Sequence, residues 1–225
     1  MIINILMLIL VSLTWFISAL PFVIPYHLFL RFKSKKLGYK IPFAHLLVAY
    51  IFVYFITVIL GLTGIPSIGD IVSNRFGIFT PDGLKIPADE INYIPFYWIS
   101  AGIRTYVENI LLFVPLGFLL PCVQRKYEAM GKTVLYGFTL SFIIELSQLF
   151  NRRVTDIDDL IMNTVGTFIG VFLFKLVKKH SVILREKVFI PNAESWKDLP
   201  LSGGEGWFYM FSTFAGMFLV YYPIF

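Results

Sequence analysis

The stretch VLYGFTLSFIIELSQLF, residues 134–150, is an almost continuous apolar run that carries one carboxylate, Glu145, near its end. The polar residues after it are Arg153, Asp156, Asp158, Asp159 and Asn163. A charge at the centre of a bilayer costs roughly 2.5–3.5 kcal/mol on insertion scales, so such residues usually face a protein interior and mark function. We therefore expect Glu145 to face other helices rather than lipid.

The composition is that of a membrane protein. Hydrophobic residues make up 57% of the 225 residues, charged residues make up 15%, and the mean hydropathy is +0.77. A soluble domain of this length would carry more charge, and its apolar runs would be interrupted at helix or strand periods. The single cysteine, Cys122, cannot form an internal disulfide bond.

Apolar stretches long enough to cross about 30 Å of hydrocarbon predict an all-α, polytopic transmembrane helix bundle of about six spans. The first lacks the basic start of a signal peptide and is too long for one, so we expect it to be retained. Pro115 interrupts the third and predicts a kink there. The six expected spans cover residues 2–30, 42–62, 109–123, 134–150, 160–177 and 207–225.

The distribution of lysine and arginine predicts the orientation in the membrane. Short loops rich in these residues stay on the cytoplasmic side. The loops after the first, third and fifth spans hold most of them, whereas Arg75, Lys85, Arg104, Arg152 and Arg153 fall on the other side. Both termini are therefore expected outside. The net charge of +5 then reflects this bias and anionic lipid headgroups, without nucleic-acid binding.

The same reasoning divides the chain into four parts. Residues 1–40 form the first helix and a basic cytoplasmic loop, and residues 41–177 form a membrane core that includes the long external loop 63–103. A cytoplasmic connector, 178–206, precedes the last helix, 207–225. The loop 63–103 is long enough to act as a lid or a partner surface, or to be a solvated linker.

This topology places the unusual polar residues at one membrane face. Gln148 lies three residues after Glu145 and so shares its helical face. Arg104, Glu108 and Asn109 precede or open the third span at the same face. On the fifth span, polar and small residues recur at helical spacing, and the glycines would allow close helix packing. These residues are Asp159, Asn163, Gly166 and Gly170.

The same polar residues could also have purely structural roles. Asp156 with Asp159, or Thr155 with Asp158, has the spacing of an N-cap and N3 pair that starts a helix. Arg153 would then be a counter-ion of the aspartates. Glu145 would pair with Arg104 or Arg153 to pin helices together.

Three strings carry a resemblance to a known family. They are Asn109-Ile-Leu-Leu-Phe-Val-Pro-Leu-Gly-Phe-Leu-Leu-Pro121, Ser141-Phe-Ile-Ile-Glu-Leu-Ser-Gln148 and Arg153-Val-Thr-Asp-Ile-Asp-Asp-Leu-Ile-Met-Asn163. Together with Asn92-Tyr-Ile-Pro-Phe96, they resemble the VanZ-like family over about residues 41–177. That family consists of bacterial multi-pass membrane proteins whose founding member is associated with teicoplanin resistance. The resemblance implies such a role for this chain.

The leading hypothesis is a binding role at the cell envelope. An outward-facing groove between the third, fourth and fifth spans would take the lipid tail of a lipoglycopeptide antibiotic or a lipid-linked wall precursor, and polar residues would contact its head group. The expected ligand-binding residues are Arg104, Asn109, Glu145, Gln148, Arg153, Asp156, Asp159 and Asn163.

Two other classes of function stay open. The first is an intramembrane hydrolase or transferase that acts on a lipid-linked substrate, with Glu145 or Asp159 as acid or base. Asp156, Asp158 and Asp159 are its candidate oxygen ligands for a divalent cation, and no other cofactor is expected. The second is a structural or partner-binding subunit whose polar stripe only locks its own helices.

Overall fold

The computed structural model describes residues 2–38, 41–81, 83–84, 91–92, 94–96, 103–151, 153–181 and 202–221. The predicted all-α class is confirmed, because helices account for nearly all of its regular structure. The long helices are α1 (Ile2–Lys36), α2 (Phe43–Thr63), α4 (Arg104–Val123), α5 (Met130–Gln148) and α6 (Ile157–His180). The shorter ones are α3 (Ile68–Val72), η3 (Arg125–Glu128), η5 (Ser202–Gly204), α8 (Glu205–Ala215) and the π-helical turn η6 (Gly216–Val220).

The six expected spans coincide with α1, α2, α4, α5, α6 and the pair α8–η6. Four stretches of the described residues are long and apolar enough to cross a membrane, namely Leu6–Lys36, Phe43–Val72, Arg104–Val123 and Ile157–His180. The full number of six spans and the outside position of both termini stay predictions. Arg152, Lys85 and most of the expected connector 178–206 lie outside the described residues.

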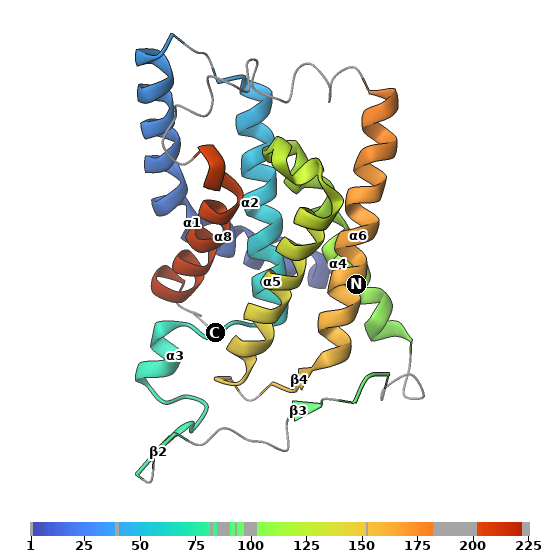
Figure 1. Ribbon diagram of the computed structural model, residues 1–225. Coiled ribbons are helices and arrows are strands. Elements are labelled where there is room, and N and C mark those ends of the chain that lie inside the picture. The colour runs from blue at the N-terminus through green and yellow to red at the C-terminus, as the bar shows by residue number, and fades with distance from the viewer. Residues whose placement is uncertain are drawn as a thin grey trace.

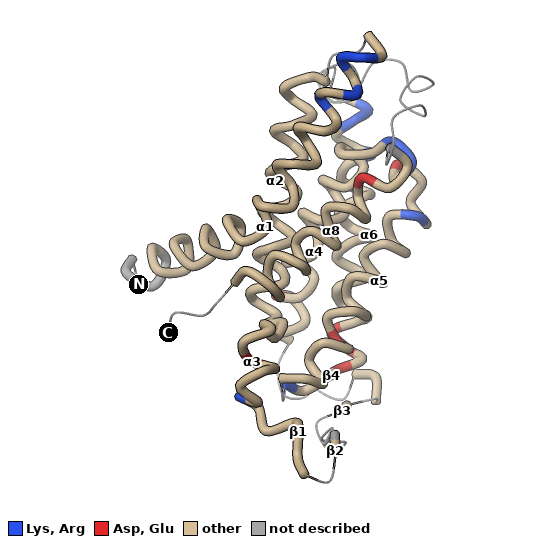
Figure 2. Tube along the Cα trace, turned by 90° about the vertical axis from the view of Figure 1, so that its left-hand side faces the viewer, with Lys and Arg blue, Asp and Glu red and all other residues tan. Residues whose placement is uncertain are grey.

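The helices form a bundle with α2 near its centre (Figure 1). Helix α2 packs against α1, α4 and α8, and its buried side chains form a continuous apolar core with α4 and α5. Phe52, Phe113 and Tyr136 are fully buried in this core. Figure 2 shows that the first part of α1 runs away from the bundle, across the direction of the other helices. The helix contains Pro21 and Pro25, which each remove a backbone donor.

Glycines allow α4 and α6 to pack backbone against backbone, which is the most extensive helix contact in the molecule. A Cβ atom added at Gly170 would clash with the carbonyl oxygen of Val114, and one added at Gly166 would clash with that of Ile110. On the opposite helix, a Cβ atom at Gly117 would clash with the carbonyl oxygen of Thr167. The close packing that the sequence predicts for Gly166 and Gly170 is confirmed.

The two ends of the bundle differ in charge, as Figure 2 shows. Lysine and arginine gather at the end that holds the C-terminal end of α1 and η3, whereas the carboxylates of α5 and α6 lie at the other end. We call the latter the carboxylate end. Its position agrees with the side that the sequence predicts to be external.

Two small sheets lie at the carboxylate end (Figure 1). Strand β1 (Phe79–Thr80) pairs with β2 (Gly83–Leu84) as an antiparallel hairpin. Strand β3 (Ile91–Asn92) pairs in parallel with β4 (Thr155–Asp156), so that Asn92 lies opposite Asp156. The second pairing ties the long loop after α2 to the start of α6.

Replacing Gly170 by valine should destabilise the protein, because the added atoms meet backbone that cannot move aside. Overpacking of this kind costs about 1–3 kcal/mol, and more where backbone must shift. Thermal unfolding of the purified protein in detergent measures the effect. Gly131→Ala is the matched control, since a Cβ atom there meets nothing within 4 Å. Equal melting temperatures for the two variants would contradict the packing role of Gly170.

The orientation can be tested with single cysteines. Val154, which is 51% exposed at the carboxylate end, and Lys179, which is exposed at the other end, are suitable positions. A membrane-impermeant thiol reagent added to intact cells should label Val154→Cys, and should label Lys179→Cys only after permeabilisation. The native Cys122 is buried and adds little background. The reverse pattern would place the carboxylate end in the cytoplasm.

Candidate functional site

Glu145 faces the protein interior, as the sequence predicts. Its side chain is only 5% exposed, and Oε2 accepts a hydrogen bond from the backbone N–H of Asp156 at 2.9 Å. The hydroxyl of Thr155 donates to the backbone carbonyl of Glu145 at 3.2 Å. These bonds hold strand β4 across the last turn of α5.

Asp156 connects three segments of the chain. It is the N-cap of α6, because its Oδ1 atom accepts a hydrogen bond from the backbone N–H of Asp158 at 2.9 Å. The same atom accepts a second bond from the side-chain amide of Asn92 at 3.0 Å. The capping interpretation is therefore confirmed for Asp156, and the aspartate also holds strand β3 in place.

Asp158 is fully buried and accepts two short hydrogen bonds. Its Oδ1 atom receives the backbone N–H of Phe96 at 2.6 Å, and Oδ2 receives the hydroxyl of Tyr106 at 2.6 Å. Phe96 adopts the left-handed region with φ of 62°, which is unusual for a bulky residue. Asp158 thus ties the loop before α4 and the start of α4 to α6.

Asp159 and Asn163 face α4 and α5 from successive turns of α6. Oδ1 of Asp159 accepts a hydrogen bond from the side-chain amide of Asn109 on α4. The side-chain amide of Asn163 donates to the hydroxyl of Ser141 on α5 at 2.9 Å. The polar stripe predicted for this helix therefore lies against both of its neighbours.

Two buried amide oxygens at this end have no partner among the described residues. They are Oδ1 of Asn163 and Oε1 of Gln148, and their residues are 2% and 5% exposed. The nitrogen of the Gln148 amide donates to the backbone carbonyl of Thr63 at 3.3 Å. Because most buried polar atoms are paired, these oxygens mark places where a hydrogen-bond donor would be stabilised.

The two arginines that the sequence assigns to the site bind elsewhere. Arg104 is highly exposed and forms an ion pair with Glu108 at 2.7 Å. Arg153 donates to the backbone carbonyls of Leu62 at 3.2 Å and Thr63 at 2.6 Å, at the C-terminal end of α2. In the described parts of the chain, no lysine or arginine forms a salt bridge with Glu145 or with the three aspartates. The alternative that either arginine pairs with Glu145 is wrong, and Arg153 is not a counter-ion of the aspartates.

The three aspartates do not converge on one point. Asp156 binds Asn92, Asp158 binds Tyr106, and Asp159 binds Asn109. Within the described ranges, no group of three or more histidine, cysteine, aspartate or glutamate side chains could hold a metal ion. The divalent-cation site suggested by the sequence therefore has no support in this geometry.

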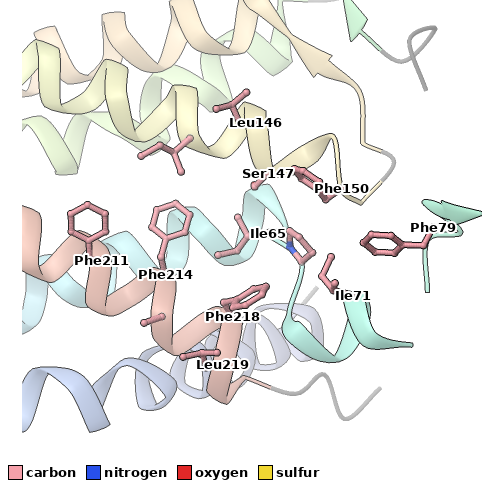
Figure 3. A pocket seen from close by; sticks show the side chains of 13 residues that line it. Ile65, Ile71, Phe79, Leu146, Ser147, Phe150, Phe211, Phe214, Phe218 and Leu219 are labelled. Atoms are coloured by element: carbon pink, nitrogen blue, oxygen red, sulfur yellow. The ribbon is translucent and has the colours of Figure 1, made fainter. Parts of the chain in front are cut away.

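The groove expected between α4, α5 and α6 stays a prediction. Where α4 and α6 meet, their glycines bring the two backbones together. A large apolar cavity of about 740 Å³ lies on the other side of α5, next to α8 and η6 (Figure 3). Sequence spacing shows which face of α5 is polar but not which helix covers its apolar face.

The polar side chains at this end, which we call the carboxylate cluster, include three that were not expected from the sequence. Tyr106 and Ser141 gave no signal beyond their place on an apolar helix, and Asn92 appeared only in the string Asn92–Phe96. The spacing of Asn92 from Asp156 becomes meaningful only once strands β3 and β4 are paired. The members of the carboxylate cluster are Asn92, Tyr106, Asn109, Ser141, Glu145, Gln148, Asp156, Asp158, Asp159 and Asn163.

Comparison with known proteins places this region in a family. The family model described as VanZ/LLP1 matches residues 47–178, which include α4, α5 and α6. The chain is also similar to Protein VanZ from Enterococcus faecium, with 34% identity over 93 residues that cover 40% of this chain and 55% of that protein. The chain thus spans about half the length of this curated relative. No solved structure matches it.

Removing the charge of Asp158 should destabilise the fold. In Asp158→Asn, the side-chain NH₂ group would face one of the two present donors, the Phe96 N–H or the Tyr106 hydroxyl, in a fully buried site. Two facing donors cannot form a hydrogen bond, and an unsatisfied buried group costs roughly 1–3 kcal/mol. Tyr106→Phe should cost less, and the double variant should cost less than the sum of the two. Thermal unfolding checks this, with exposed Glu108→Gln as the control. Strict additivity would contradict a direct bond between Tyr106 and Asp158.

Proposed function

Because this chain belongs to the VanZ/LLP1 family, we propose that it contributes to resistance against glycopeptide antibiotics of the teicoplanin type. It does so by binding, at the carboxylate cluster, the polar part of the antibiotic or of a lipid-linked cell-wall precursor. The similarity to Protein VanZ supports the role. The chemistry of the cluster supports the kind of ligand.

One observation carries this proposal: the cluster holds more acceptors than donors. Four carboxylates lie at the C-terminal end of α5, on strand β4 and at the N-terminal end of α6. Their described hydrogen-bond donors are backbone amides, two asparagines and a tyrosine. The two unpaired amide oxygens, on Gln148 and Asn163, add further acceptors. A ligand that supplies ammonium or amide N–H groups would complete these bonds, whereas an anionic ligand would be repelled.

Burial strengthens the hydrogen bonds that such a ligand would form with the cluster. Hydrogen bonds to charged groups contribute roughly 1.5–3 kcal/mol, and the low local dielectric inside a helix bundle strengthens them. Glu145 combines a carboxylate with 5% exposure, so a bound cationic donor would stabilise the ionised form of this residue most. Glycopeptides and the peptide stems of wall precursors both carry amine and amide donors.

Replacement of Glu145 by glutamine tests the proposal, because it keeps the side-chain shape and an oxygen for the Asp156 N–H group while removing the charge. We expect the affinity for the antibiotic or the precursor to fall about 10- to 100-fold, which is the range that loss of one charged hydrogen bond implies. Protection of cells against teicoplanin should fall in parallel. Binding to the purified protein and the minimum inhibitory concentration are the two measurements.

The matched control is Glu108→Gln, which removes one carboxylate at the same end but outside the cluster. Membrane abundance of each variant is measured alongside protection. Unchanged protection and unchanged binding in Glu145→Gln, at normal abundance, would rule out the carboxylate cluster as the binding site. Steady conversion of the precursor by the native chain would instead indicate a catalytic role.

A further inference from the structure

We propose that a second site, on the opposite face of α5 from the carboxylate cluster, binds an anionic membrane lipid. One acyl chain would occupy the apolar cavity between α5 and the α8–η6 pair, which we call the α5–α8 groove. The phosphate head group would lie on Arg75 and Arg153 in an adjoining polar cavity. This site goes beyond the proposed function, because it needs neither the antibiotic nor the carboxylates.

The α5–α8 groove has the size and lining of a hydrocarbon site. Its volume of about 740 Å³ falls within the roughly 300–1,000 Å³ of ligand pockets. Figure 3 shows Leu146 of α5 and Phe150, in the turn after α5, on one wall and Phe214 and Phe218 on the other. The hydroxyl of Ser147, which also lines the groove, donates to the backbone carbonyl of Ile144 at 2.7 Å and so is paired.

Part of the groove wall is exposed on the outside of the bundle. Several of its lining side chains are partly exposed, including Phe79 at 47%, Leu146 at 44% and Leu219 at 53%. A lipid chain could therefore enter laterally without crossing a polar rim. Such an opening favours a ligand already dissolved in the membrane over one that arrives from water.

The π-helical turn η6 shapes both cavities. It places Phe218 and Leu219 in the groove and Met217 in the polar cavity. Gly216, at the start of this turn, lets it pack directly on α1, because a Cβ atom there would meet the backbone of Ser18 and Ala19. Single π-helical turns inside longer helices occur frequently at functional sites.

A polar cavity of about 290 Å³ adjoins the groove and shares Ile65 and Pro66 with it. Its charged lining residues are Asp70, Arg75 and Arg153, which leaves one net positive charge. Arg75 forms an ion pair with Asp70 at 3.0 Å, and its side chain stays 53% exposed. The backbone carbonyls of Leu62 and Thr63 orient Arg153 without neutralising it.

The charges select an anionic head group. Arginine presents several N–H donors in a planar fork that matches the oxygens of phosphate. Among the described residues, the rest of the carboxylate end carries an excess of acidic groups, so an anion would be better stabilised in this cavity than beside the carboxylate cluster. On α5, the groove is lined by Ile143, Leu146 and Ser147, whereas Ser141, Glu145 and Gln148 face the opposite way.

Photolabelling of the full chain tests the site. The protein is reconstituted into phosphatidylcholine nanodiscs that contain trace phosphatidylglycerol with a photoreactive acyl chain, and the labelled residues are mapped by mass spectrometry. We expect labels on α5 and α8 at the groove to exceed those on Phe168 and Phe172, which have similar exposure on α6. A phosphatidylcholine probe with the same acyl chain should label the groove less.

Four variants sharpen the result. Ala215→Trp fills the groove and should abolish its excess label, while Leu111→Trp, on the exposed face of α4, should not. Arg75→Gln should lower the preference for phosphatidylglycerol by about fivefold, the contribution of one arginine near an anionic lipid surface. Arg75→Lys should restore most of that preference.

Three outcomes would overturn the proposal. Groove labelling no greater than that of Phe168 and Phe172 would mean bulk lipid only, and equal labelling by both probes would exclude recognition of the head group. Displacement by a lipoglycopeptide but not by unlabelled phosphatidylglycerol would assign the groove to a different occupant. Glu145→Gln should leave the labelling unchanged, so this test and the resistance test can fail independently.

Discussion

The close approach of α4 and α6 is the constraint on which the rest of the structure depends. Gly117, Gly166 and Gly170 remove the side chains that would separate the two backbones. The packing fixes the register of the helices, so that Tyr106 and Asn109 at the start of α4 lie beside Asp158 and Asp159 at the start of α6. Without this register, Asp158 and Asp159 would lose the donors that α4 supplies, and an unpaired buried carboxylate is costly in a membrane protein.

The carboxylate cluster differs from a structural ion-pair network in its balance of charge. A network that only pins helices together would place a lysine or arginine against each buried carboxylate, since an uncompensated buried charge is strongly destabilising. Here neutral donors from the backbone, asparagine and tyrosine hold the described carboxylates. That arrangement keeps the aspartates in position while leaving the site negative, which suits recognition of a donor-rich ligand.

Features that depend on local pattern could be predicted from the sequence. The apolar runs located the helices, and the cost of a buried charge predicted that Glu145 faces inward. The spacing before α6 predicted a cap at Asp156 or Thr155, and the structure has it at Asp156. Contacts between distant segments could not be predicted, because Asn92 and Tyr106 gain their roles only through pairing across the fold. Arg153 was misassigned because closeness in sequence to the aspartates does not determine where a long side chain points.

The sequence separation between donors and acceptors in the carboxylate cluster determines when the cluster can form during synthesis. Asn92 precedes its partner Asp156 by 64 residues, and Tyr106 precedes Asp158 by 52. At roughly 5–20 residues per second of synthesis, these donors leave the ribosome several seconds before their acceptors exist. The carboxylate cluster can therefore be completed only after the start of α6 has been synthesised, and a chain arrested before that helix would contain Asn92 and Tyr106 without the aspartates that they bind.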